Sequence, residues 1–128
     1  MIALPIVVLI CLFLSAGHIR WGLDHPFRIL RESTIDEVVP ASLHACWYHV
    51  SVVFLVTALA CLTHMAALPL STDAFVLLWL LNFLCWLCYL GTLYFFPGLW
   101  KAVWPQIVLI AIVLGSLGWF LVVNPSSA

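Results

Sequence analysis

Four of the five histidines lie near one end of the long apolar segments, and they have the clearest potential for chemistry. His18 closes the first apolar segment, His25 follows it, and His44 and His49 lie in the opening turns of the second. His18 and His49 are predicted at comparable depth on adjacent antiparallel helices. Neutral imidazole is a good ligand for copper, zinc and iron. The pattern therefore makes His18 and His49 candidate ligands for a haem or a transition metal, with His44 or Tyr94 nearby.

The alternative is that these histidines are interfacial or hydrogen-bonded structural groups. His44 and His49 are five residues apart, about 500° of helix rotation, so they do not share one face of a helix. The two can bind one ion only if the helix is irregular. The sequence leaves the metal-binding and the structural interpretation open.

Three further positions have side chains suited to contacts between helices. Trp47 and Ser51 are four residues apart and share one helix face, although an indole at this position also suits an anchor at the membrane interface. Asn82 lies within an apolar segment, so it needs a partner and could bridge two helices. The predicted bundle-facing stripe around it consists of Asn82, Cys85, Trp86 and Tyr89.

Composition assigns the chain to the membrane class. Of its 128 residues 66% are hydrophobic and 7% are charged, whereas soluble domains have about 25% charged residues. The net charge of −1 and the lack of a basic patch argue against nucleic acid as a partner. The five cysteines lie in apolar segments, where Cys85-Trp86-Leu87-Cys88 is better explained by packing than by redox chemistry.

The sequence contains no catalytic constellation. It shows no nucleophile–base pair and no cluster of carboxylates, which argues against hydrolase or di-iron chemistry. No Asp, Glu, Lys or Arg lies in the middle of an apolar segment, which argues against a proton-driven exporter. We therefore favour a non-enzymatic protein.

The apolar segments predict an all-α fold, a four-helix transmembrane bundle that forms a single domain. Short connections make neighbouring helices antiparallel, in an up-down-up-down order. The polar segment 20–40 is either a plain charged loop or contains a short surface helix that starts at Pro26. The predicted spans are about 2–19, 41–68, 74–96 and 103–123.

The Lys and Arg residues predict the topology. Three arginines lie between the first two spans and Lys101 lies between the last two, so the positive-inside rule places both loops in the cytoplasm and both termini outside. The aromatic residues predicted to form a belt near that face are Trp21, Tyr94, Trp100 and Trp104.

Short motifs resemble a loose group of uncharacterised four-span bacterial membrane proteins. The matching positions are His18 at the end of the first span, Glu37 and Pro40 in the loop, Trp47 and His49 at the start of the second span, and Trp104-Pro105 at the start of the last. The resemblance implies a four-span bundle in the bacterial inner membrane, with periplasmic termini under the topology above. It implies no activity.

Three functional hypotheses follow. The first is an accessory or homo-oligomeric membrane component that acts by helix packing, with the lipid bilayer, its own copies or a larger complex as partners. The second is a haem- or metal-binding protein that uses His18 and His49. The third is a small oligomeric transporter or channel, in which Asn82 or the histidines would contact the solute.

Overall fold

The computed structural model describes residues 2–68 and 70–124, and the elements in these ranges are helical. Four helices are long and apolar enough to cross a membrane, which confirms the predicted all-α bundle and makes the chain a small polytopic membrane protein. The elements are α1 (Ala3–Asp24), α2 (Pro26–Arg31), α3 (Val38–Met65), α4 (Thr72–Phe95), the 3₁₀ turn η1 (Pro97–Leu99) and α5 (Trp100–Val123).

Local sequence explains where several helices begin. Pro26 is the first residue of α2, so its missing N–H costs nothing. Of the two possibilities left open for the polar segment, the structure therefore has the short helix that starts at Pro26. Ser71 caps α4 by accepting a hydrogen bond from the Ala74 N–H at 3.3 Å. Pro97 follows the end of α4 and starts η1, which leads directly into α5.

The observed helix bounds differ from the predicted ones at several ends. α1 continues to Asp24, because its last turn is closed by the His25 N–H bonding to the Trp21 carbonyl. α3 starts at Val38, so Pro40 lies inside its first turn instead of opening it, where a proline is equally tolerated. α5 starts at Trp100, which places Pro105 inside the helix. The predicted stops at Pro69 and Pro125 lie outside the described residues.

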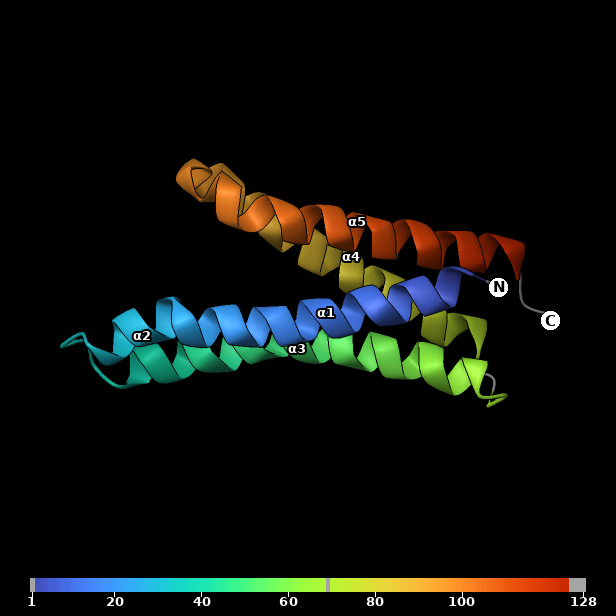
Figure 1. Ribbon diagram of the computed structural model, residues 1–128, viewed down its shortest axis with the longest axis horizontal. Coiled ribbons are helices and arrows are strands. Elements are labelled where there is room, and N and C mark those ends of the chain that lie inside the picture. Colours follow the sequence, from blue (N-terminus) through green and yellow to red (C-terminus); the bar gives the residue numbers. More distant parts are fainter. Residues whose placement is uncertain (1, 69, 125–128) are drawn as a thin grey trace.

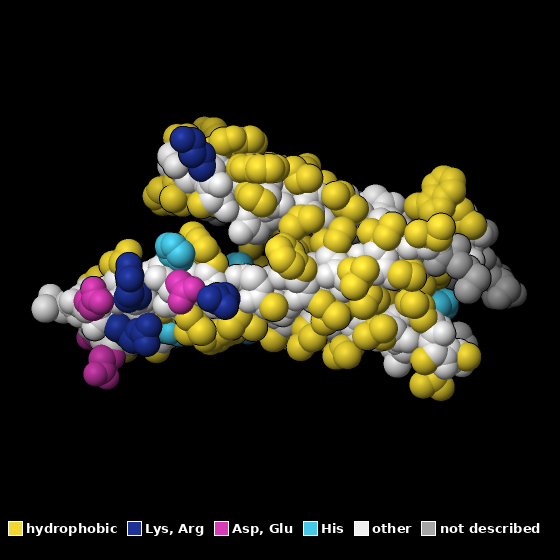
Figure 2. Space-filling model, viewed as in Figure 1, with side chains coloured by type: hydrophobic (Ala, Val, Ile, Leu, Met, Phe, Trp, Pro, Cys, Tyr) yellow, Lys and Arg dark blue, Asp and Glu magenta, His cyan; other side chains and the backbone are white. Residues whose placement is uncertain are grey.

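The helices form two antiparallel pairs, α1 with α3 and α4 with α5 (Figure 1). The pairs are joined mainly by packing of α1 against α5, while α3 and α4 touch less extensively. Both ends of the described chain lie together, opposite α2 (Figure 1). On the face shown in Figure 2, the charged side chains gather at the α2 end and the rest of the surface is largely hydrophobic. We call these two ends the polar-loop end and the terminal end.

The core runs along the middle of the bundle and is mostly aliphatic and aromatic. All four long helices contribute to it. Its most completely buried members are Val7, Cys11, Phe54, Ala58, Cys61, Phe75, Ile110, Val113 and Leu117.

Candidate functional site

His18 is the centre of a closely packed aromatic cluster near the polar-loop end. Its ring stacks on Trp47 with centroids 4.1 Å apart and an angle of 6° between the planes. Its Nδ1 lies 3.0 Å from the Tyr89 hydroxyl, and only 8% of the residue is exposed. We call His18, Trp47 and Tyr89 the His18 cluster, because these side chains join α1, α3 and α4.

The indole of Trp47 is fixed from two directions. Its Nε1–H donates to the His18 carbonyl at 2.8 Å, so Trp47 both stacks on His18 and bonds its backbone. Gly22 faces the same indole, and a β-carbon at Gly22 would collide with the indole nitrogen. A glycine is therefore required for α3 to approach α1 this closely.

The aromatic packing continues from the His18 cluster towards the polar loop. Trp21 stacks between Trp47 and His25, with centroids 5.4 Å and 5.3 Å away. Phe27 of α2 is buried and stacks on His44 at 3.5 Å, which holds the short helix against α3. His44 also has its Nδ1 at 2.9 Å from the Pro40 carbonyl.

Two polar contacts lie deeper in the bundle. The Ser15 hydroxyl donates to the Ser51 carbonyl at 3.1 Å, which bridges α1 and α3. The Asn82 amide donates to the Thr57 hydroxyl at 2.9 Å, which bridges α4 and α3 and confirms the expected helix-bridging role of Asn82. Buried polar groups need such partners in a membrane, so these bonds fix how the helices face one another.

Two more indoles connect α4 to α5. Trp79 donates to the Leu114 carbonyl at 3.0 Å and Trp86 donates to the Ile107 carbonyl at 3.1 Å. Together with Trp47, three of the seven tryptophans bond a backbone carbonyl on a neighbouring helix. The indole dipoles are therefore used inside the bundle to hold helices together.

Some hydrogen-bonding capacity remains unused among the described residues. The buried atoms without a partner there are His18 Nε2, Ser51 Oγ and Asn82 Oδ1. His18 Nε2 is the most relevant of these chemically, because its ring is already oriented through Nδ1 by Tyr89.

The structure separates the histidines that the sequence grouped. His18 is buried, whereas His49 is exposed, and His44 packs on Phe27 instead of contacting His18. Tyr94 and Trp104 are exposed as well. Among residues 2–68 and 70–124, no three His, Cys, Asp or Glu side chains are grouped so as to hold a metal ion. The five cysteines are free.

No family model matches the chain, and no match is found among curated proteins or solved structures. The function is therefore inferred from the geometry of the described residues.

The spacing of residues in the second span indicates that Trp47, which contacts His18, faces the interior of the bundle. Trp47, Ser51, Phe54, Ala58 and Cys61 recur at steps of three and four residues, which defines one face of α3, and the structure packs this face inward. His49 falls outside that series. Tyr89 belongs to the stripe predicted to face the bundle, yet its contact with His18 depends on how α4 lies across the interior.

Proposed function

We propose that the protein is a non-enzymatic integral membrane component that acts by helix packing, first of all with further copies of itself. The observation that carries the proposal is an exposed seam on α4. Its members recur at steps of three and four residues, the spacing that brings side chains of two helices together in coiled-coil-like packing. The α4 seam consists of the exposed Leu77, Leu80, Leu84, Leu87 and Tyr94, with the half-buried Gly91 in line with them.

The internal contacts support this function indirectly. The described tryptophan and asparagine contacts between helices fix the fold, and they leave the α4 seam facing outward. A β-carbon at Gly91 would meet nothing within 4 Å, so this glycine serves no close contact inside the chain. A glycine in a helix costs about 1 kcal/mol relative to alanine, which favours a role in contact with another helix.

The test compares two sets of leucine substitutions in lipid nanodiscs. Replacing Leu80, Leu84 and Leu87 of α4 by alanine should convert the oligomer to a monomer, as measured by chemical cross-linking and particle mass. The matched control replaces Leu55, Leu59 and Leu62 of α3, which are exposed at the same spacing on a helix that contains no glycine, and it should leave the oligomer intact. A monomeric native protein, or equal effects of both sets, would contradict the proposal. A native protein that associates only with other membrane proteins would favour the accessory role in a larger complex.

We also propose that the protein lies in the bacterial inner membrane with its polar-loop end in the cytoplasm. The order of the helices puts Lys101 at the same end as Arg20, Arg28 and Arg31, which supports this orientation through the positive-inside rule. A reporter enzyme fused after residue 128 should then report a periplasmic location. A cytoplasmic signal would invert the assignment.

A second candidate function is binding of a haem or transition metal through His18. It is supported by the unpartnered Nε2 and by the Nδ1 contact with Tyr89, because metal-binding histidines are usually oriented through their second nitrogen. A visible spectrum and elemental analysis of the purified protein test it. A bound species that His18→Ala abolishes and His49→Ala leaves unchanged would support a His18 site. A spectrum and metal content that are the same in His18→Ala would refute it.

A further inference from the structure

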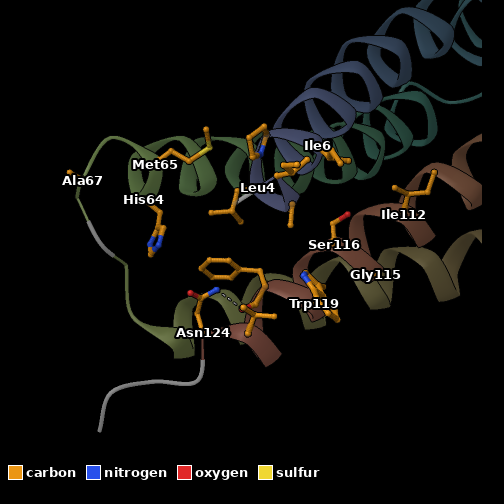
Figure 3. Close-up of a pocket in the computed structure, with 15 residues that line it drawn as sticks. Leu4, Ile6, His64, Met65, Ala67, Ile112, Gly115, Ser116, Trp119 and Asn124 are labelled. Atoms are coloured by element: carbon orange, nitrogen blue, oxygen red, sulfur yellow. Dashed lines mark hydrogen bonds between the residues drawn. The ribbon is translucent and has the colours of Figure 1, made fainter.

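A large open hollow lies at the terminal end of the described structure, away from the His18 cluster. It is an open groove of about 1330 Å³ between the first turns of α1 and the last turns of α3 and α5. Figure 3 shows His64 of α3 and Asn124 after α5 at one end of this groove, with Ser116 and Ile112 further along α5. We call it the terminal groove.

The dimensions of the terminal groove match a lipid better than a small metabolite. Small-molecule pockets usually enclose about 300–1,000 Å³, which is less than the volume here. Along α5 the lining extends from Ile112 to Asn124, a rise of about 18 Å. The hydrocarbon core of a bilayer is about 30 Å thick, so the groove reaches from the membrane boundary to near the midplane. That depth corresponds to the acyl chains of one leaflet.

The polarity of the lining changes along the groove. Its body is formed mostly by apolar side chains such as Leu4, Ile6, Ile112 and Trp119, with Ser116 as a polar exception. Its mouth carries His64 and Asn124, which lie where α3 and α5 end. An apolar channel with hydrogen-bonding groups at the membrane boundary fits a molecule that has an apolar tail and a polar head.

His64 and Asn124 offer one donor and one acceptor to that head. His64 Nδ1 accepts a hydrogen bond from the Leu70 N–H at 3.4 Å, so the neutral ring carries its proton on Nε2. Asn124 donates its amide N–H to the Phe120 carbonyl at 3.0 Å, which leaves its side-chain oxygen as an acceptor. A hydroxyl or a carbonyl on the ligand satisfies this combination.

The charge of the lining excludes the commonest membrane lipids as preferred ligands. The described residues that line the terminal groove include no Lys, Arg, Asp or Glu. A phosphate-bearing head group therefore has no cationic partner there, and desolvating it beside apolar walls is unfavourable. A neutral head avoids this cost.

We propose that the terminal groove binds a neutral membrane lipid whose head carries a hydroxyl or a carbonyl group. The acyl or prenyl tail lies along α5 beneath Trp119, and the head contacts His64 and Asn124. The site uses α1, α3 and α5, so it does not depend on the α4 seam.

The test uses two photoactivatable lipids with identical acyl chains in nanodiscs that hold the full chain. One is a diacylglycerol and the other is the matching phosphatidylglycerol, and labelled peptides are mapped by mass spectrometry. We expect the diacylglycerol to label segments 62–68 and 112–124 about fivefold more strongly, because the phosphate of its competitor would be desolvated there without a cationic partner. His64→Phe removes a hydrogen-bonding group and should weaken diacylglycerol labelling about fivefold, the ratio that one hydrogen bond gives.

A glycine pair provides the matched control. A β-carbon at Gly115 meets nothing within 4 Å, so Gly115→Leu should fold normally while its side chain fills the groove and abolishes labelling. Gly17 has the same free space but does not line the groove, so Gly17→Leu should keep full labelling. If Gly115→Leu loses its helical circular dichroism, Ser116→Leu fills the groove from the next position.

Three results would overturn the proposal. Equal labelling by both lipids would mean that the groove takes ordinary boundary lipid. Labelling that persists in a folded groove-filling variant would place the lipid elsewhere. Cross-links between α5 helices of two chains, lost in Gly115→Leu, would mean that a second copy fills the groove.

Discussion

The two ends of the bundle each contain a histidine packed among aromatic rings, but one is closed and the other is open. His18 lies face to face with Trp47 and is almost fully buried. His64 meets Phe75 and Phe120 edge to face, at 5.1 Å and 5.3 Å, and lines the terminal groove. A histidine is therefore part of a close helix contact at the polar-loop end, and another histidine is part of a groove wall at the terminal end.

The difference follows from how closely the helices approach. At the polar-loop end, Gly22 lets α3 bring Trp47 directly against α1. At the terminal end, Leu4 and Ile6 of α1 and Ser116 of α5 surround a hollow instead of filling it (Figure 3). A closed contact needs complementary large and small residues, and Gly22 with Trp47 provides such a pair between α1 and α3.

The largest effect is expected from closing the space that Gly22 provides. Gly22→Ala should destabilise the bundle by about 3 kcal/mol, because the new methyl group forces the Trp47 indole out of place. Unfolding in mixed detergent micelles, followed by circular dichroism, measures this. Gly17→Ala adds the same methyl group in open space and should stabilise by at most about 1 kcal/mol. Similar values for both would show that the close approach at Gly22 is not required.

Trp47→Phe should come next, at about 2 kcal/mol. It removes the hydrogen bond to the His18 carbonyl and part of the stacking area while it keeps an aromatic ring. The same unfolding assay applies. Trp104→Phe changes an exposed indole and should cost less than about 0.5 kcal/mol. An equally small effect at Trp47 would show that the His18 cluster is not a closed, stabilising contact at the polar-loop end.

Thr57→Val tests the hydrogen bond between Asn82 of α4 and Thr57 of α3, which lies midway between the two ends of the bundle. It removes the acceptor for the Asn82 amide and should destabilise by about 1 kcal/mol, in the range measured for hydrogen bonds between membrane helices. Thr63→Val is the control on the same helix, because the Thr63 hydroxyl bonds only carbonyls of its own turn among the described contacts. Its unfolding free energy should stay close to that of the native chain. Equal losses in the two variants would mean that the bridge to α4 contributes nothing.

The smallest stability effect is expected at the open end. His64→Phe keeps a ring beside Phe75 and Phe120, so the unfolding free energy should change by less than about 0.5 kcal/mol. His18→Phe should cost more, because it loses the Tyr89 contact. If His64→Phe proved the more damaging of the two, the assignment of closed and open ends would be reversed.

Much of the fold follows from local sequence, while the sites depend on how the helices meet. Hydropathy gives the four spans, Ser71 gives the start of α4, and Pro26 gives α2. The stripe through Asn82, Trp86 and Tyr89 correctly predicts which side of α4 faces inward. Equal depth does not by itself bring two side chains together: His18 is buried against Trp47 and Tyr89, whereas His49, two residues after Trp47 and so about 200° around α3, is exposed. The terminal groove has no sequence motif, since it arises from the space that three helices leave between them.

The arrangement of helix pairs also has a consequence for the order of events during synthesis. Each pair is a hairpin of neighbouring segments, α1 with α3 and α4 with α5, whereas the joining contact of α1 with α5 links opposite ends of the chain. Local contacts form early and distant ones late. We expect the first hairpin, with its His18–Trp47 stack, to assemble on the ribosome before α4 emerges. A disulfide cross-link engineered between α1 and α3 in stalled nascent chains would detect this early hairpin. The terminal groove would form only after α5 has packed against α1, because α5 provides one of its walls.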